Sequence, residues 1–166
     1  MNATTWHCCV ETPLGVLRAT TDDRSIVALA YDAAVVETSS PPPDAAGLLL
    51  DTLRRQLDRY FAGRCTTFDV PLAPAGTSFQ RAVWTALCAV RHGETASYAQ
   101  IAQRIGSPAA VRAVGAANGR NPIAIVIPCH RIIGSNGALT GYAGGLDRKR
   151  ALLALEAPAP FAHQAA

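Results

Sequence analysis

The chain has 166 residues, of which 49% are hydrophobic and 16% charged, with a net charge of +3. This composition predicts a soluble globular protein of one domain or two small ones. No apolar run reaches the roughly 18 residues that cross a membrane, and the N-terminus does not resemble a signal peptide, so we expect a cytoplasmic protein without a membrane partner.

The N-terminal part of the sequence predicts three short strands followed by a helix. The strands are expected at Trp6–Val10, Leu14–Thr20 and Ile26–Tyr31, between turn-forming residues. The proline-rich loop 38–43 cannot be helical. Asp44 is the expected N-cap of the helix that follows.

That helix carries apolar residues at every fourth position. They are Leu49, Leu53, Leu57 and Phe61. Gly63 is the expected stop, and a short apolar stretch at 68–72 leads onward. The first half of the chain is therefore predicted to be a small α/β unit.

The second half is predicted to be mostly helical. It starts with an apolar stripe formed by Phe79, Val83, Leu87 and Val90. A short helix should follow at 98–105 after Ser97 and end at Gly106. Ser107 and Pro108, as N-cap and first helical residue, should then open a helix of small residues at 109–117.

Two short helices joined by a tight turn are typical of a helix-turn-helix, although an ordinary helical hairpin has the same pattern. The second helix is smooth, since alanine and glycine dominate it, and Arg112 is its one basic residue. Such a surface suits a nucleic-acid groove or tight helix packing. Asn136-Gly137 between the apolar pairs 132–133 and 138–139 predicts a hairpin, which beside a helix-turn-helix would form a wing.

Charge is unevenly distributed between the two halves. Residues 1–76 carry six arginines against nine acidic residues, whereas residues 77–156 carry nine basic residues against three acidic ones. This asymmetry indicates that the second half meets a polyanion, and ordinary scatter is the alternative.

The candidate reactive group is Cys129, which follows the apolar run 123–127 and Pro128 and precedes His130. A thiol has an ordinary pKa near 8.5 and needs help to ionise at neutral pH. An imidazole can take its proton, and a carboxylate can orient the imidazole. We nominate Glu156, on the final predicted helix 146–157.

Neighbouring side chains point apart on an extended segment, so either a turn at Pro128 or a bridging water must connect Cys129 and His130, and we favour the water. A buried, inert cysteine beside a surface histidine is the alternative.

At this point the sequence closely resembles the O6-alkylguanine-DNA alkyltransferases. The resemblance rests on Ser97-Tyr98, Arg112-Ala113-Val114-Gly115, Asn121-Pro122, Ile127-Pro128-Cys129-His130-Arg131, Gly141-Tyr142-Ala143-Gly144-Gly145 and Leu152-Leu153-Ala154-Leu155-Glu156. It implies an RNase H-like α/β domain at 1–76, a mostly helical catalytic domain with a winged helix-turn-helix at 77–157, and a short tail at 158–166.

The resemblance also implies an activity: direct-reversal DNA repair by a suicide protein. Cys129 would irreversibly accept the alkyl group of O6-alkylguanine, with O4-alkylthymine as a further candidate substrate. His130 would act as the base through water, with Glu156 orienting it. Because the lesion lies inside the base stack, the base must be flipped out of the duplex.

Further roles are carried over in the same way. Asn121 would brace the active-site turn, Tyr98 would supply a proton and rotate the base, and Arg112 would fill the gap in the duplex. The smooth helix would contact DNA through Ala110, Ala113 and Gly115, and the base pocket would comprise Tyr98, Ile132, Tyr142 and Ala143, with main-chain groups at Cys129, Ile132 and Ala143 reading the base edge.

No cofactor is implied, and the partner would be double-stranded DNA bound by a monomer, with cooperative assembly as an option. Some relatives carry a structural zinc. Here His7, Cys8 and Cys9 are clustered without a spaced set to complete a tetrahedral site, so we expect no metal. Those two cysteines, with Cys65 and Cys88, are expected to fill apolar positions as thiols.

Two other functions stay open from the residues alone. One is a lesion-binding module that flips the base without chemistry. The other is a cysteine hydrolase using Cys129, His130 and Glu156, which would leave the smooth helix, the wing and Tyr98 without a role.

Overall fold

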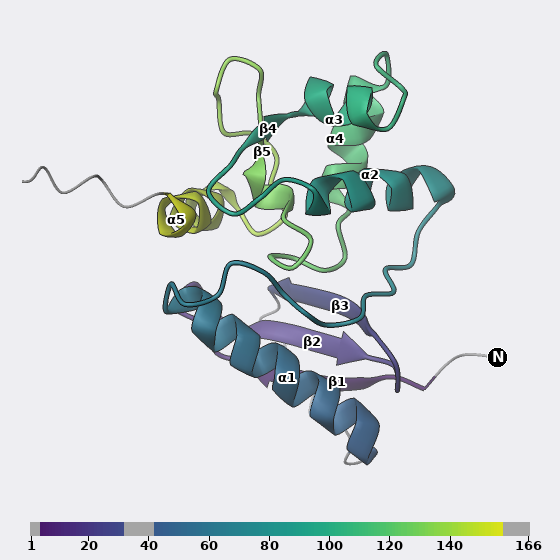
Figure 1. The fold of residues 1–166 in the computed structure, drawn as a ribbon, viewed down its shortest axis with the longest axis vertical. Coiled ribbons are helices and arrows are strands. Elements are labelled where there is room, and N and C mark those ends of the chain that lie inside the picture. Colours follow the sequence, from purple (N-terminus) through teal and green to yellow (C-terminus); the bar gives the residue numbers. More distant parts are fainter. Residues whose placement is uncertain (1–3, 32–41, 158–166) are drawn as a thin grey trace, which may run out of the picture.

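The computed structural model describes residues 4–31 and 42–157, and these form two layers of structure (Figure 1). The N-terminal layer is a three-stranded antiparallel sheet in the order β1-β2-β3, covered on one face by α1. Its elements are β1 (Trp6–Val10), β2 (Leu17–Thr21), β3 (Ile26–Tyr31) and α1 (Asp44–Phe61). The mixed α and β structure confirms the predicted fold class. Part of the predicted loop 38–43, and the predicted tail 158–166, lie outside the described residues.

The second layer is built from helices and two very short strands. Its elements are α2 (Ser78–Cys88), β4 (Ala96–Ser97), α3 (Tyr98–Arg104), α4 (Val111–Gly119), the single-turn 3-10 helix η1 (Cys129–Arg131), β5 (Ile132–Ile133) and α5 (Leu146–Glu156). Helices α2, α3 and α4 pack against one another. Among the described residues, no helix is both long and apolar enough to span a membrane.

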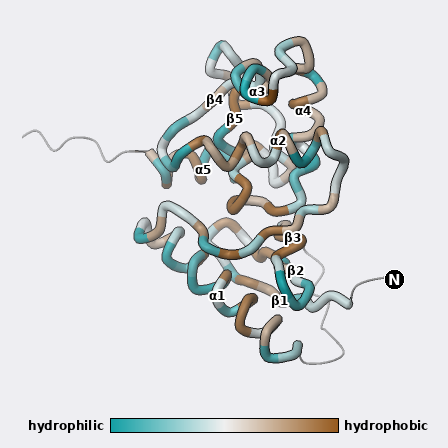
Figure 2. Tube along the Cα trace, turned by 45° about the vertical axis from the view of Figure 1, so that its right-hand side comes forward, coloured by the Kyte–Doolittle hydropathy of each residue, from teal (hydrophilic) through white to brown (hydrophobic). Residues whose placement is uncertain are grey.

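The free edge of β3 joins the two layers. Leu29 donates its backbone N–H to the Pro122 carbonyl and accepts from the Ala124 N–H, both at 2.8 Å. Ile26 makes a similar bridge to Leu72, at the end of the stretch 68–72. The segment that follows α4 therefore lies directly on the N-terminal sheet, and apolar chain meets apolar chain there (Figure 2).

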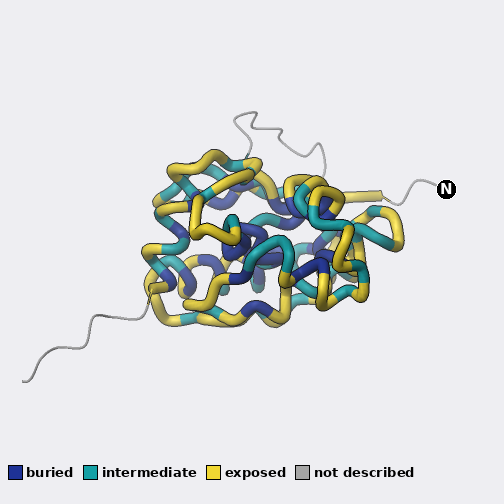
Figure 3. The backbone as a smooth tube through the Cα atoms, turned by 90° about the horizontal axis from the view of Figure 1, so that it is seen from above, coloured by how far each residue is buried: buried dark blue, intermediate teal, exposed yellow. Residues whose placement is uncertain are grey.

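The core runs through both layers as one cluster of buried residues (Figure 3). On α1 the predicted stripe is partly wrong, because the buried face is centred on Leu50, Leu53, Leu57 and Tyr60. Leu49 and Phe61 lie only partly buried at its edges. The stripe of α2 is confirmed, with Val83, Leu87 and Val90 buried and Phe79 packed beside them.

The starts of two N-terminal elements differ from prediction. Strand β2 begins three residues late because residues 12–15 form a turn, in which the Gly15 N–H donates to the Thr12 carbonyl at 3.0 Å. Gly15 has a φ of 111°, which favours glycine. Helix α1 begins at Asp44 itself, with Pro43 as its N-cap, so the predicted capping role of Asp44 is wrong. Gly63 does follow the helix end in a left-handed conformation.

The helix pair in the second layer is partly as predicted. Ser97 caps α3 through a reciprocal pair of hydrogen bonds with Gln100, and Gly106 ends that region with a φ of 70°. Helix α4, however, begins at Val111, with Ala110 as its N-cap. Ser107 instead accepts the Ala110 N–H in a turn, so its capping role and the helical position of Pro108 are wrong.

The predicted hairpin is also wrong in its strands. Ile132 and Ile133 pair in parallel with Ala96 and Ser97, and residues 138–139 form no strand. The turn itself is present, since the Gly134 N–H donates to the Ala138 carbonyl at 2.8 Å. The turn follows from the local Asn136-Gly137 sequence, whereas the pairing of residues 132–133 depends on their position beside β4.

Candidate active site around Cys129

Cys129 begins the 3-10 turn η1 and is buried, with 4% of its surface exposed. The segment before it alternates, with Ile123, Ile125 and Ile127 buried in the core. Ile125 has a φ of 69°, which is rare for a β-branched residue and marks a strained backbone. The backbone is therefore bent and strained in the segment immediately before Cys129.

Asn121 braces this bend and also touches the sulfur. Its Oδ1 accepts the Ile123 N–H at 3.0 Å, and its Nδ2 donates to the Ile127 carbonyl at 2.7 Å. The same Nδ2 lies 3.0 Å from Cys129 Sγ. The bracing geometry matches the role expected of Asn121, and the contact with the sulfur adds a donor that stabilises a thiolate.

His130 is fully buried and bonded to Glu156, the predicted partner. Its Nε2 lies 2.9 Å from Glu156 Oε1. Arg131 donates to both oxygens of the same carboxylate, at 2.7 and 2.8 Å. Tyr60, from α1, donates its hydroxyl to Oε1 at 2.6 Å. Four donor bonds thus fix one carboxylate, and one of them comes from the other layer.

The electrostatics of this group follow from burial and these bonds. Burial raises the pKa of Glu156, but the donors from His130 and Arg131 outweigh it and hold that pKa well below its usual range. Burial lowers the pKa of His130, against the opposing pull of Glu156. The imidazole is therefore neutral near pH 7. Because Nε2–H faces a carboxylate, Nδ1 is the unprotonated nitrogen and can accept a proton.

Nδ1 of His130 is buried and has no hydrogen-bond partner among the described residues. A direct bond between the Cys129 thiol and the imidazole is thus absent in this conformation. Proton transfer from Cys129 to His130 through a bridging water, which we expected because the two residues are neighbours in the sequence, stays a prediction.

Burial raises the pKa of the Cys129 thiol, and three groups act against it. They are the Asn121 donor, the charge of Lys149, and backbone N–H groups of η1. Lys149 is fully buried, and its Nζ donates to the carbonyls of Ile132 and Thr140. The sequence-based reasoning missed this residue, although one signal was available: Lys149 is the single lysine beside fourteen arginines.

A cavity of about 90 Å³ lies beside the sulfur. Asn121, Cys129, Tyr142 and Ala143 line it, so the structure brings together four of the residues expected at the site. Two others are not part of its lining. Tyr98 is half-buried next to α4 and donates its hydroxyl to the Thr140 carbonyl at 3.1 Å. The Ile132 carbonyl is occupied by Lys149.

The candidate DNA-contacting residues lie on α4 and its N-cap. Arg112 and Ala113 are exposed, whereas Ala110 and Gly115 are half-buried. A Cβ added at Gly115 would lie 3.8 Å from the Tyr98 ring, an ordinary contact distance. None of these four lines the cavity beside Cys129. Helix α4 thus carries the expected DNA-contacting residues near its start, whereas its last residues, Asn118 and Gly119, line the cavity.

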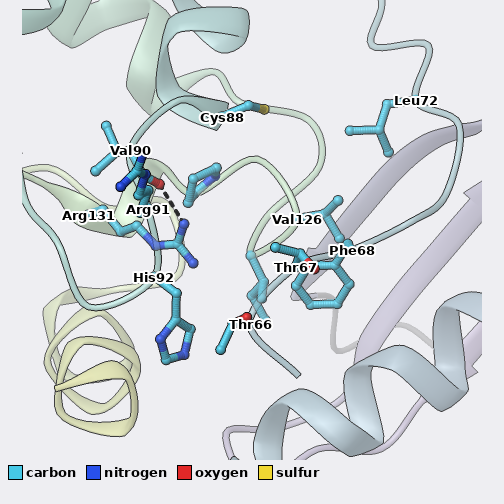
Figure 4. A pocket seen from close by; sticks show the side chains of 12 residues that line it. Thr66, Thr67, Phe68, Leu72, Cys88, Val90, Arg91, His92, Val126 and Arg131 are labelled. Atoms are coloured by element: carbon cyan, nitrogen blue, oxygen red, sulfur yellow. Dashed lines mark hydrogen bonds between the residues drawn. The ribbon is translucent and has the colours of Figure 1, made fainter. Parts of the chain in front are cut away.

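A second, larger cavity of about 660 Å³ has Pro128 in its lining, and Figure 4 shows Arg131 and Val90 on one side of it and Phe68 and Leu72 on the other. Arg131 forms part of its wall and donates Nη1 to the Val90 carbonyl at 2.7 Å. All three nitrogens of the guanidinium are thus bonded, Nη1 to the Val90 carbonyl and Nε and Nη2 to Glu156. This cavity is thus backed by the same arginine that orders the carboxylate.

All five cysteines are free thiols. Cys8 and Cys65 are half-buried, whereas Cys9 and Cys88 are exposed, so the expectation that all four fill apolar positions is wrong for the last two. Among residues 4–31 and 42–157, no group of three or more histidine, cysteine or acidic side chains is arranged to hold a metal ion.

Comparison with known proteins gives two family matches that together span most of the chain. The ribonuclease-like domain of 6-O-methylguanine DNA methyltransferase matches residues 7–74, and the DNA binding domain of the same family matches residues 78–158.

Individual relatives agree with these matches. A methylated-DNA–protein-cysteine methyltransferase of Mycolicibacterium paratuberculosis is 49% identical over 152 residues, covering 89% of both chains. One from Methanosarcina mazei is 63% identical over 101 residues, covering 61% of this chain and 64% of the relative, which is less than two thirds of its length.

A solved structure, Mycobacterium tuberculosis OGT in complex with DNA, matches with a TM-score of 0.78 and 47% identity, covering 92% of this chain and 95% of that one. The similarity thus extends through both layers of the fold. The chain belongs to the methylated-DNA–protein-cysteine methyltransferase family.

Proposed function

We propose that this protein repairs O6-alkylguanine in double-stranded DNA by transferring the alkyl group to Cys129, once per molecule. The observation that carries the proposal is the placement of Cys129 Sγ at the wall of a cavity, 3.0 Å from the Asn121 donor and beside the buried His130–Glu156 pair. A thiolate, a base and an oriented carboxylate are the parts that nucleophilic transfer requires.

The proposed reaction is a nucleophilic displacement at the alkyl carbon. His130 Nδ1 takes the thiol proton through water, and the thiolate attacks the alkyl carbon. An S–C bond forms while the bond from that carbon to O6 breaks, and the electron pair leaves on O6 of guanine. The dealkylated guanine, still part of the DNA strand, takes up one proton, for which we propose Tyr98 as the source. The product thioether is stable, so each molecule acts once.

DNA recognition is assigned to α3 and α4. Arg112 and Ala113 form an exposed surface on α4, and the Mycobacterium tuberculosis relative was solved in complex with DNA. Reaching the lesion requires base flipping. In our proposal Arg112 fills the vacated space, while Tyr142, the main chain at Ala143, and Tyr98 receive the base; the main chain at Ile132 is already bonded to Cys129 and Lys149.

The remaining assignments extend the same proposal. Residues 1–76 would support a catalytic and DNA-binding part at 77–157, and the molecule would act as a monomer in the cytoplasm, with cooperative binding on DNA as an option. The free thiols suit a reducing compartment.

Intact-protein mass spectrometry after mixing with a duplex containing O6-methylguanine tests the function. We expect one methyl group per molecule, mapped to Cys129 by peptide sequencing, at one-to-one stoichiometry. Cys129→Ser should abolish transfer yet bind the same duplex, because the phosphate contacts lie elsewhere. An oligonucleotide that keeps its methyl group after long incubation with the folded wild-type protein would refute the proposal and favour a lesion-binding module.

A further inference from the structure

One wall of the cavity beside Cys129 comes from the N-terminal sheet. Besides Cys129, the lining residues form three groups: 29–31 at the end of β3, the end of α4 at 118–119 with Asn121 and Ala124 after it, and the segment 142–144 before α5. Tyr31 is the one aromatic side chain that the sheet contributes to this wall. The sequence-based reasoning gave the N-terminal half no part in the reaction.

We propose that Tyr31 is a specificity-determining residue, whose ring closes the cavity opposite the sulfur and sets the largest alkyl group that Cys129 can accept. This inference rests on the alkyl transfer proposed above. It assigns the N-terminal sheet a direct role in choosing among lesions, with small O6-alkyl groups as the preferred class.

The ring of Tyr31 is held firmly in place. The guanidinium of Arg148 stacks over it, 4.3 Å from the ring centre. Arg148 is itself fixed, because its Nε donates to the Leu14 carbonyl at 2.7 Å and its Nη1 to the Gly144 carbonyl at 3.0 Å. One arginine therefore ties the β1–β2 turn, the Tyr31 ring and the segment before α5 together.

Gly144 shows how tightly this wall is packed. A Cβ placed there would lie 2.6 Å from the Tyr142 ring and 3.0 Å from the Tyr31 ring. Only glycine fits between the two rings without displacing one of them. The wall cannot easily recede, because movement of Tyr31 would disturb both its stack on Arg148 and its packing on this segment.

The volume of the cavity gives the expected limit. At about 90 Å³ it is smaller than the roughly 150 Å³ cavity that admits benzene. With the base lodged against Tyr142 and Ala143, a methyl group needs little further space beside the sulfur, whereas a benzyl group requires the wall to move. Removing the Tyr31 ring is the shortest way to provide that space.

The ring, and not its hydroxyl, should set the limit. The hydroxyls of Tyr31 and Tyr142 are buried and lie near each other, with no other hydrogen-bond partner among the described residues. Burial raises the pKa of Tyr31 to about 12, although the charge of Arg148 and the Tyr142 hydroxyl oppose this. The phenol is therefore neutral at working pH. Phenylalanine at this position would keep the size of the wall and remove only the hydroxyl.

The test compares wild type, Tyr31→Ala and the matched control Tyr31→Phe on two duplexes, one with O6-methylguanine and one with O6-benzylguanine. The quantity measured is the ratio of the benzyl to the methyl transfer rate. We expect Tyr31→Ala to raise this ratio by about tenfold, the effect of roughly 1.4 kcal/mol on the barrier, and Tyr31→Phe to leave it within about twofold. An unchanged ratio in Tyr31→Ala, or an equal rise in Tyr31→Phe, overturns the inference.

A second readout without DNA separates this inference from the proposed function. Iodomethane and benzyl bromide both alkylate a thiol, and peptide mapping reports the reaction at Cys129 alone. The benzyl-to-methyl ratio at Cys129 should rise in Tyr31→Ala even if no duplex is repaired, and a constant ratio overturns the inference while leaving repair intact. If Tyr31→Ala does not fold, Tyr31→Leu removes the planar ring at a smaller loss of volume and must shift the ratio in the same direction.

Discussion

At the scale of single residues, the reactivity of Cys129 is a balance between burial and a few donors. Burial alone would leave the thiol protonated at neutral pH. The Asn121 amide and the Lys149 charge, from distant parts of the chain, act in the opposite direction. Asn121 does two tasks at once, since it braces the bend at 123–127 and donates to the sulfur.

Asn121→Asp tests the donor to the sulfur. The substitution keeps the shape and the Oδ1 acceptor for the Ile123 N–H, but it replaces Nδ2, the donor to Sγ and to the Ile127 carbonyl, by a negatively charged oxygen. The thiol pKa should rise by about one unit or more, and the rate of Cys129 alkylation by iodoacetamide at pH 7 should fall about tenfold per unit.

The measurement is the pH profile of that alkylation, read by peptide mapping. Cys88, an exposed thiol in the same protein, serves as the internal control and should keep its profile. An unchanged profile at Cys129 in a folded Asn121→Asp protein would contradict the role assigned to the amide.

At the scale of elements, α4 presents the proposed DNA-contacting surface near its start and lines the cavity beside Cys129 with its last two residues. Arg112 is the second residue of α4 and is exposed, whereas Val114 and Ala117 on the same helix are buried against α2 and α3. The late start of the helix at Val111 places Arg112 in its first turn. One face of the helix is thus free while the other is anchored.

Arg112→Ala should slow repair of a paired lesion but not reaction with the free base. Flipping a base costs a few kcal/mol of stacking and pairing, and a side chain in the gap offsets part of that cost. We expect at least a tenfold (about 1.4 kcal/mol) slower reaction with O6-methylguanine duplex, and less than a twofold (about 0.4 kcal/mol) change with free O6-benzylguanine.

Single-turnover kinetics on both substrates check this prediction. Arg150→Ala is the matched control, because Arg150 is an exposed arginine on α5 that pairs with Asp147. Equal slowing on both substrates in Arg112→Ala would remove the intercalating role.

At the scale of the whole molecule, the two layers meet at the carboxylate of Glu156. Tyr60 from α1 donates to Glu156, and Arg131 pairs with it from η1. A buried ion pair that loses one partner leaves an uncompensated charge, which costs about 3–5 kcal/mol. The contacts of Glu156 therefore also stabilise the packing of the two layers against each other.

Glu156→Gln should accordingly lower the free energy of unfolding by about 3–5 kcal/mol at pH 7. In wild type the folded pKa of Glu156 lies below its unfolded value of about 4.3. Its contribution is therefore fully present above pH 4.3 or so and is lost as the pH falls below it. Urea unfolding of both proteins at pH 7 and near pH 3 should show the difference shrinking in acid.

The exposed pair partner Asp147 provides the control, since Asp147→Asn should leave the unfolding transition nearly where it was. If the difference in unfolding free energy between wild type and Glu156→Gln is the same at both pH values, packing and not the charge of Glu156 stabilises the contact between the layers.

How far the sequence predicts this protein is clearest from particular residues. Strands β1 and β3, the apolar stripe of α2, and the pairing of His130 with Glu156 follow from local patterns and from the family resemblance. The start of α4 was misplaced because Ser107-Pro108 is a strong local start signal, whereas the chain uses it as a turn. The 138–139 strand was wrong because Ile132 and Ile133 find a partner in β4.

The sequence by itself pointed to Cys129, His130 and Glu156 as the candidate site and to most of the helices and strands, because these depend on residue types and on short spacings. Only the tertiary structure decided that Lys149 is buried close enough to act on the sulfur, that Tyr60 reaches Glu156, and that Tyr31 walls the cavity. The Tyr60–Glu156 contact joins residues 96 positions apart, and the path of the backbone between such residues, which no local pattern encodes, sets their distances.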